Sequence, residues 1–230
     1  MKLNKIRKKL LEIRDRGYIE TSRSGTTGVG KTLEDLLDVK ENNISSPDLG
    51  RIELKSRRYN QVVPITLFTF NKRSWKIKRI DAIREYGSRH KNGRLGLYYL
   101  MSLKPNSAGL FLNVEEDEVS VRSIDGTIIA SWNLDEIVKR FNKKVSSVLL
   151  VKASVETRFG KEHFWFNSAK LCSGGTSKSI LRSQFIDEKF LLNIRMHEKE
   201  KGKVKDHGTG FRINENDLDE FYFDVKEILG

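Results

Sequence analysis

Helical and β periodicity are segregated along this chain: two amphipathic helices come first, and a long series of short β runs follows. Leucine and isoleucine recur at helical spacing over residues 3–13, and Gly17 predicts the end of a first helix. The segment TLEDLLDV predicts a second helix from about residue 31 to 41, with Thr32 and Asp35 as a capping pair. Helices first and strand meanders later predict an α+β or mixed α/β fold.

The segment RIELKS carries the clearest strand signal. Apolar Ile52 and Leu54 alternate with charged Glu53 and Lys55, which predicts a strand with one buried face. No repeat and no linker divides the 230 residues, so we expect one domain with two lobes. The other expected elements are strands at QVVPITLFTF, LFLNV, EVSVRSI, TIIASW, SSVLLVKASVE, HFWFN, FLLNIRM, FRI and FYFDVKEI, a hairpin turn at Asp125-Gly126, a helix with Asn133 and Glu136 as a capping box, and a short helix from Ser177 to Phe185.

The positive charge is concentrated in one stretch. The whole chain has a net charge of +12, and residues 51–104 alone carry 14 Lys and Arg against three Asp and Glu. A field concentrated in this way attracts polyanions, and nucleic acid is the commonest soluble polyanion. The alternative interpretation is a surface whose charge only keeps the protein soluble. The pattern favours nucleic acid as a partner.

The string GTTGVGKT at residues 25–32 fits the phosphate-binding pattern GxxxxGK[ST]. A working nucleotide loop needs a buried strand that leads directly into the first glycine, but residues 20–24 are polar throughout. An apolar strand ending in a magnesium-binding Asp is also required downstream, and none is evident. A glycine-rich turn that caps the next helix, and that still suits an anion, is the simpler interpretation. An NTPase is kept as an alternative.

Asp48 and the sequence Glu53-Leu54-Lys55 form a second motif. Alternation puts Glu53 and Lys55 on one face of a strand, with their Cα atoms about 6.6 Å apart. Asp48 precedes that strand in a turn and can fold back beside them. Two carboxylates and an ammonium at one place form a hard-oxygen site for Mg²⁺, which fits phosphodiester hydrolysis. The alternative is a solvated strand face on which Glu53 and Lys55 form a surface pair.

Composition excludes several other classes of protein. No run of 18 uncharged apolar residues is present, so no membrane span is expected. The start of the chain, MKLNKIRKKLLEIRDR, lacks the apolar region of a signal peptide. A single cysteine, Cys172, excludes a disulfide framework and a cysteine-based zinc site. We therefore expect an intracellular protein without a membrane partner.

Two long segments resemble the MvaI/BcnI family of restriction endonucleases, which are relatives of the mismatch-repair nicking enzyme MutH. GTTGVGKTLEDLLDVKENNISSPDLGRIELKS resembles the catalytic segment, and KGKVKDHGTGFRINENDL resembles the closing segment. RIDAIREYGSRHKNG and WFNSAKL are similar to further family pieces. The resemblance implies a PD-(D/E)xK nuclease core, mainly within residues 1–100, and a strand-rich DNA-recognition lobe, mainly in the C-terminal half.

The resemblance also implies roles for single residues. Asp48 and Glu53 become ligands of Mg²⁺, Lys55 the catalytic lysine, and Glu34 a further acidic residue of the catalytic centre. A solvated position on the helix is the alternative for Glu34. The residues expected to contact DNA are Asn193, Arg195, Lys203, Lys205, Asp206, His207 and Arg212. Arginine pairs with guanine and aspartate accepts from cytosine in the major groove. A buried structural histidine is the alternative for His207.

Together these observations predict a magnesium-dependent, sequence-specific double-strand DNA endonuclease, a type II restriction enzyme. The resemblance implies a monomer, and we expect a monomer to cut one strand at a time, because its lone active site faces one strand. Double-stranded DNA is the expected partner, and a cognate DNA methyltransferase the expected genetic partner, in a prokaryotic cytoplasm, at the nucleoid while the enzyme acts. The alternatives are a MutH-like nicking endonuclease in repair and a DNA-binding module with an inactive site, against which the intact Asp48, Glu53 and Lys55 argue.

Overall fold

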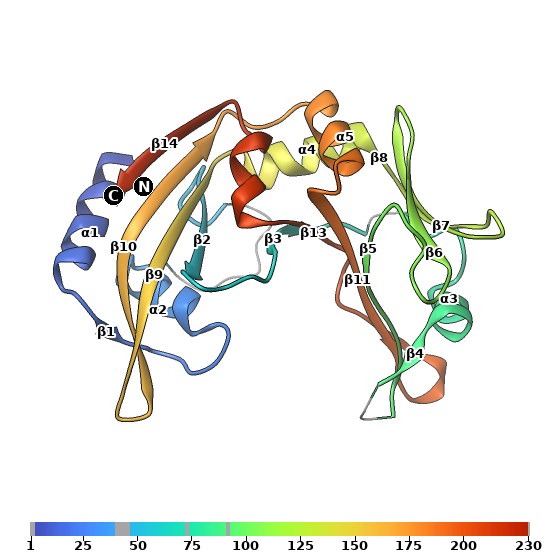
Figure 1. Cartoon of the computed structure of the whole chain (residues 1–230), viewed down its shortest axis with the longest axis horizontal. Helices are drawn as coiled ribbons and strands as arrows, with labels where there is room; N and C mark the ends of the chain where they lie inside the picture. Colours follow the sequence, from blue (N-terminus) through green and yellow to red (C-terminus); the bar gives the residue numbers. More distant parts are fainter. Residues whose placement is uncertain (1–2, 40–46, 72–73, 91–92, 230) are drawn as a thin grey trace. The chain divides into compact units, whose positions relative to one another are not determined.

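A computed structural model describes residues 3–39, 47–71, 74–90 and 93–229 of the chain (Figure 1). The chain divides into two units, each built from segments that are separate in the sequence. The first unit comprises Met1–Val63, Asn142–Gly175 and Tyr222–Gly230, and the second comprises Pro64–Phe141 and Thr176–Phe221.

The first unit contains, within the described residues, a five-stranded mixed sheet with the strand order β1-β10-β9-β2 and with β14 paired to β10. Strand β2 runs parallel to β9, and the other pairs are antiparallel. Its elements are α1 (Leu3–Asp15), β1 (Ile19–Glu20), α2 (Gly28–Leu36), β2 (Glu53–Arg58), β9 (Val148–Arg158), β10 (Lys161–Ser173) and β14 (Asp224–Leu229).

Apolar faces of both helices and of the sheet form the core of the first unit. Ile6 and Leu10 of α1 and Leu33 of α2 are fully buried, as are Phe164 and Phe166 of β10. These residues recur at helical spacing in the helices and at every second position in the strand, so each element contributes one apolar face. Helix α2 and strand β2 therefore pack into the same hydrophobic core.

The second unit contains two antiparallel sheets within the described residues. One has the order β3-β13-β11-β5-β4 with β12 paired to β11, and the other has the order β6-β7-β8. The elements are β3 (Ile65–Thr69), α3 (Arg79–Tyr86), β4 (Ser88–Arg89), β5 (Leu95–Met101), β6 (Leu110–Val114), β7 (Glu118–Ser123), β8 (Ile128–Asn133), α4 (Leu134–Val145), α5 (Lys178–Ile186), β11 (Phe190–Glu198), η1 (Glu200–Gly202), β12 (Val204–Asp206), β13 (Gly210–Ile213) and η2 (Glu215–Phe221). Helix α4 begins in the second unit, and its last residues belong to the first.

The α+β fold class is confirmed, and most expected elements are present. The first helix, the strand at RIELKS and the three-strand meander lie where the periodicity predicts them. Asn133 caps α4, because its Oδ1 accepts hydrogen bonds from the amides of Asp135 at 2.9 Å and Glu136 at 3.2 Å. Within the described residues, no helix is long and apolar enough to cross a bilayer.

The second helix differs from its prediction. It begins at Gly28, three residues early, and Thr27 rather than Thr32 is its N-cap. The capping pair is therefore wrong: Thr32 lies inside the helix and donates to the carbonyl oxygen of Gly28, and Asp35 pairs with Lys31. The available signal was Val29, which lies four residues before Leu33 on the buried face, but the glycines on either side of it favoured a turn. The helix also ends earlier than expected, at Leu36 with Leu37 as its C-cap, and not near residue 41.

Other differences arise from long-range packing. Helix α3 and strand β5 were not expected, and the last strand begins at Asp224 because the residues before it form η2 with buried Leu218 and Phe221. The lobes also differ in extent from the expected division, since residues 64–100 lie in the second unit and β9 joins the first by pairing with β2. Which unit carries the active site and which unit recognises DNA stays a prediction.

Candidate active site

Strand β2 brings Glu53 and Lys55 together. Its parallel pairing with β9 places Glu53 opposite Val148, and the Glu53 amide donates to the carbonyl oxygen of Ser147 at 2.9 Å. The Glu53 residue is only 3% exposed. Lys55, two residues along the same face, donates from Nζ to Glu53 Oε1 at 2.8 Å. The surface-pair interpretation is therefore wrong for Glu53, because its carboxylate is buried.

A second lysine contacts the same carboxylate, and the sequence analysis did not predict it as a residue of the site. Lys144, in the last turn of α4, has its Nζ 2.8 Å from Glu53 Oε2. Both oxygens of the buried carboxylate are therefore matched by ammonium groups, which offsets the cost of burying a charge. The available signal was the basic end of a helix directly before an apolar strand. It predicts a contact with Glu53 only when the parallel pairing of β2 with β9 is known.

Asp48 folds back onto β2 as predicted. Its Oδ2 accepts a hydrogen bond from the amide of Leu54 at 3.0 Å, and the turn between them is closed by the bond from the Leu49 amide to the Ile52 carbonyl oxygen at 2.9 Å. Burial, and then the neighbouring Glu53 carboxylate, raises the pKa of Asp48. The Leu54 amide and the two lysines oppose that rise. Two carboxylates this close favour a cation between them.

Asp48→Asn is expected to raise the melting temperature of the metal-free protein by a few degrees near neutral pH. The raised pKa means that the folded protein holds the Asp48 proton more tightly than the unfolded chain does. Ionisation therefore costs stability as the pH rises from about 4, the ordinary aspartate value, through the folded pKa. Asparagine removes this cost while keeping an oxygen for the Leu54 amide. Thermal unfolding at about pH 3 and about pH 7.5 tests this, and an equal shift at both values would contradict it.

The donor set fits a magnesium ion. Among the described residues no group of three or more His, Cys, Asp and Glu is placed to hold a metal, but Asp48 and Glu53 lie together. Mg²⁺ keeps several waters and commonly takes only one or two protein carboxylates with substrate phosphates. Two oxygen donors of like charge therefore suffice for this ion. Glu34, the other predicted acidic residue, is half-buried on α2.

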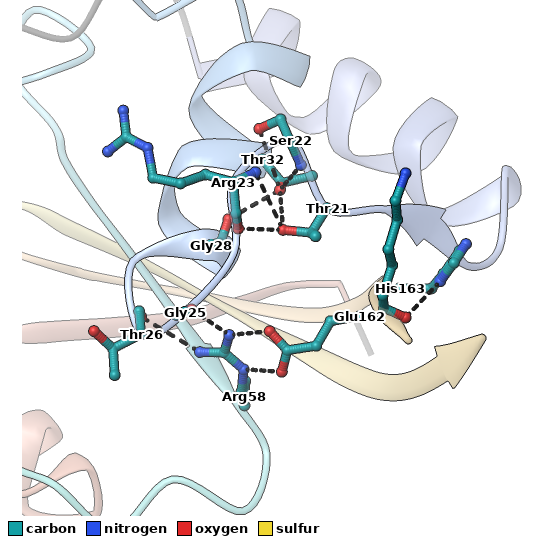
Figure 2. A network of polar contacts seen from close by, with 11 residues as sticks. Thr21, Ser22, Arg23, Gly25, Thr26, Gly28, Thr32, Arg58, Glu162 and His163 are labelled. Atoms are coloured by element: carbon teal, nitrogen blue, oxygen red, sulfur yellow. Dashed lines mark hydrogen bonds and ion pairs between the residues drawn. The ribbon is translucent and has the colours of Figure 1, made fainter. Parts of the chain in front are cut away.

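The glycine-rich string is occupied by structural contacts (Figure 2). Thr32 Oγ1 donates to the carbonyl oxygen of Gly28 at 2.9 Å and accepts from the amide of Ser22 at 3.0 Å. The Lys31 ammonium lies 2.7 Å from Asp35 Oδ1. A Cβ at Gly28 would lie 2.3 Å from the carbonyl oxygen of Arg23, so this glycine is required by packing. The lysine and threonine that would bind a nucleotide's phosphates and metal thus stabilise the turn and the helix.

Lys31→Ala is therefore expected to leave cleavage within about tenfold of the wild-type rate, and ATP is expected to have no effect. The substitution removes an i,i+4 ion pair of α2 that is partly exposed. Cleavage rates with and without ATP, and ATP binding by calorimetry, provide the measurement. A micromolar dissociation constant for ATP that is lost in the variant would contradict this interpretation.

Strand register in the second unit places several predicted DNA-binding residues on one sheet face. Asn193, which is only 9% exposed, and the half-buried Arg195 share one side of β11, and the fully buried Leu192, Ile194 and Met196 lie on the other. Arg212 of β13 is directly opposite Leu191, which shares the face of Asn193, so all three belong to the same side of the sheet. The side chains are partly anchored: Asn193 Nδ2 donates to the Tyr99 carbonyl oxygen at 3.1 Å. The guanidinium of Arg212 likewise donates to the Pro64 carbonyl oxygen at 2.6 Å.

The loop between β11 and β13 lines a basic cavity together with the end of β11 and Arg94. Its volume is about 900 Å³ and its lining contains Arg94, His197, Glu198, Lys199, Glu200, Lys203, Lys205 and His207. Three of these residues, Lys203, Lys205 and His207, are predicted DNA contacts. The sequence analysis did not identify Arg94, His197 and Lys199. His207 is exposed, so the buried-histidine alternative is wrong. Burial, and then Arg94, lowers the pKa of His197.

Asp206, a predicted DNA contact, has protein partners for both of its carboxylate oxygens. Its Oδ2 accepts from Asn71 Nδ2 at 2.8 Å and lies 3.4 Å from Arg79 Nε, and its Oδ1 accepts from the Gly208 amide at 2.8 Å. Asp206 is opposite Met196, whose side chain is on the buried face of β11. These contacts stabilise the loop before β13.

The chain is similar in sequence and structure to known restriction endonucleases. The family model of the MvaI/BcnI restriction endonuclease family matches residues 7–222. A solved complex of the restriction endonuclease MvaI with cognate DNA substrate has 27% sequence identity, full coverage of both chains and a TM-score of 0.82. MvaI solved in the absence of DNA has 27% identity, covers 99% of this chain and 97% of that chain, and has a TM-score of 0.56. No curated protein sequence matches the chain. The family match spans most of the chain, and the chain therefore belongs to the MvaI/BcnI restriction endonuclease family.

Proposed function

We propose that this family member is a magnesium-dependent type II restriction endonuclease that hydrolyses phosphodiester bonds in double-stranded DNA. The observation that carries the proposal is the meeting of Asp48, Glu53 and Lys55 at the start of β2. The solved MvaI structure with its cognate DNA substrate supports DNA as the substrate class. In this proposal Glu34 of α2 is a further acidic residue of the same site.

Asp48 and Glu53 would hold the metal ion through their carboxylate oxygens. When bound, Mg²⁺ polarises a phosphoryl oxygen and lowers the pKa of a bound water. Lys55 uses one donor on Glu53 Oε1, and its ammonium has two further N–H bonds with which to orient a water or contact a phosphate oxygen. Lys144 holds the other oxygen of Glu53 and so fixes the direction in which the carboxylate points.

The sheet face with Asn193, Arg195 and Arg212 is our candidate for base reading. Arginine bonds guanine O6 and N7 bidentately, and asparagine bonds adenine in the same way. We assign Lys203, Lys205 and His207, in the loop between β11 and β13, to contacts with the DNA backbone, because exposed N–H donors that line a wide cavity suit phosphates. We assign Asp206 to holding this loop, since both its oxygens have protein partners. That assignment replaces the expected contact with cytosine.

A monomeric enzyme with one active site must cut the two strands in separate events. The time course on a supercoiled plasmid with its target site tests this, because an open circle is expected to form before the linear product. Chelation with EDTA is expected to stop both steps. Accumulation of the open circle without linear product would instead support a nicking enzyme like MutH. A restriction role also requires a cognate methyltransferase that protects the host's own sites.

A further inference from the structure

Tyr98 of β5 and His197 of β11 form a hydrogen bond across two neighbouring strands of the second unit. The Tyr98 hydroxyl lies 2.6 Å from His197 Nδ1, and the two ring planes differ by only 19°. Strand register places Tyr98 directly opposite Arg195, and it places Gly96 opposite His197. The tyrosine therefore reaches its partner diagonally across the strands. Cross-strand neighbours share one side of a sheet, so the pair lies on the side that carries Asn193 and Arg195.

The glycine at position 96 makes this reach possible. A Cβ on Gly96 would lie 2.4 Å from Tyr98 Cε2 and 2.8 Å from Tyr98 Cδ2, which is closer than non-bonded atoms can approach. The Tyr98 ring thus lies over the backbone of Gly96, in the space that a side chain would fill. His90 packs edge-on against the same ring, with the ring centroids 4.7 Å apart. A missing side chain and a packed ring together keep the phenol beside His197.

The hydrogen bond sets which nitrogen of His197 carries a proton. His197 is only 8% exposed, and burial, and then Arg94, lowers the pKa of its imidazole, which is therefore neutral at neutral pH. A phenol is a stronger acid than a neutral imidazole, so the Tyr98 hydroxyl donates to Nδ1. Nε2 then carries the proton and is an N–H donor. His197 lines the basic cavity, and Nε2 is the ring nitrogen that this bond leaves for a ligand there.

This donor and the lysines of the cavity are held in different ways. Lys203 and Lys205 are exposed, and a flexible ammonium suits a phosphate, which offers acceptors in several directions. His197 is buried between fixed neighbours: Tyr98 holds one of its nitrogens, and the centre of the His207 ring lies 5.5 Å from the centre of its own. A single donor with a fixed direction suits an acceptor at a fixed place, such as an acceptor atom on the major-groove edge of a base.

We propose that His197 reads a base edge in the major groove through its Nε2–H, and that Tyr98 is a positioning residue that fixes this nitrogen as the donor. This inference rests on the proposed function, because it adds a reader to the sheet face with Asn193 and Arg195. The chemistry read is one hydrogen-bond acceptor, either a purine N7 or a carbonyl oxygen of guanine or thymine. A contact with the DNA backbone is the competing role, and it would not depend on sequence.

Binding of variants to matched duplexes separates the two roles. The duplexes are the target site found by sequencing of cleaved ends, a scrambled site, and two series of altered targets. One series replaces each purine in turn by its 7-deaza analogue, which lacks N7, and the other replaces each base pair. His197→Phe keeps a ring in place but has no N–H. The matched control is His163→Phe, because His163 is a half-buried histidine of β10 whose Nδ1 lies 3.2 Å from the Lys161 carbonyl oxygen.

His197→Phe is expected to bind the target duplex about tenfold more weakly than the wild type, and the scrambled duplex within about twofold. At one position of the target, the effect of the substitution is expected to disappear once the acceptor is removed. Disappearance with a 7-deazapurine identifies N7, and disappearance only with a replaced base pair identifies a carbonyl oxygen. His163→Phe is expected to match the wild type on every duplex. Equal losses for His197→Phe on target and scrambled duplexes would overturn the inference.

Tyr98→Phe tests the positioning role, because it keeps the ring and removes only the hydroxyl. It is expected to weaken binding to the target duplex about threefold, since the imidazole can then turn and exchange its tautomers. In a His197→Gln background the same change is expected to have no effect, because the glutamine amide carries its own donor. Nitrogen NMR of the protein without DNA reads the tautomer directly. A proton on Nε2 is expected in the wild type, and a proton on Nδ1 would overturn the inference.

Circular dichroism and thermal unfolding establish that each variant is folded. If His197→Phe does not fold, Tyr98→Phe decides the question, and unchanged discrimination between target and scrambled duplexes would then overturn the inference. A wild-type protein that binds the two duplexes equally would refute the proposed sequence-specific function itself. A wild type that discriminates between them, together with a His197→Phe variant that discriminates as well, would refute only the reading by His197.

Discussion

Glu53→Gln is expected to reduce the rate of DNA cleavage by about three orders of magnitude while leaving DNA affinity within about threefold. Glutamine keeps the size of the side chain but removes the charge that a metal ion requires. Affinity for DNA comes mainly from cation–phosphate contacts, which the variant retains. Asp48→Asn is expected to behave in the same way. Single-turnover cleavage at saturating Mg²⁺ and a binding measurement without Mg²⁺ provide the two readouts.

Glu12→Gln is a suitable control, because Glu12 is exposed on α1 and lies 4.0 Å from Lys8. It is expected to cleave at the wild-type rate. Full cleavage by Glu53→Gln would remove Glu53 from the metal site. Loss of DNA binding in parallel with cleavage would instead indicate that the buried pair with Lys55 and Lys144 supports the fold as a whole.

Arg195→Ala and Arg212→Ala are expected to damage specificity more than general affinity. Each is expected to cost about 1–3 kcal/mol on the cognate duplex if the arginine bonds a guanine edge. Strand register places both residues on one sheet face, and packing of β11 and β13 fixes their backbones. The measurement compares binding to cognate and scrambled duplexes at one salt concentration.

Arg122→Ala is the matched control, because Arg122 of β7 forms an ion pair with Glu115 in the three-stranded sheet. It is expected to bind both duplexes as the wild type does. Equal losses on both duplexes for Arg195→Ala and Arg212→Ala would make these residues backbone contacts. The assignment of Asp48, Glu53 and Lys55 does not depend on that result.

Local sequence patterns predicted the centre of the candidate site. Alternation in RIELKS was sufficient to place Glu53 and Lys55 on one face, and a turn between Asp48 and the strand allowed that carboxylate to fold back beside them, as the bond from the Leu54 amide confirms. The resemblance to a nuclease family then supplied roles for these residues. What local patterns did not predict is the burial of Glu53, because burial depends on the neighbouring strand.

The contacts that complete the site join residues far apart in the sequence. Lys144 reaches Glu53 because β2 pairs in parallel with β9, and nothing in either segment specifies that pairing. The glycine-rich string was ambiguous for the same reason. Its structural role depends on Arg58 and Glu162, which lie outside it. The first turn of α2 was missed although Val29 continues the apolar spacing, because the glycines on either side of Val29 favoured a turn.

Digestion of a long plasmid with the protein and Mg²⁺, followed by sequencing of the fragment ends, tests the central claim most directly. We expect discrete fragments whose ends share one short sequence, no cleavage in EDTA, and no cleavage by Glu53→Gln under the same conditions. Ends without a common sequence, or the same fragments from Glu53→Gln, would contradict a site-specific nuclease centred on β2.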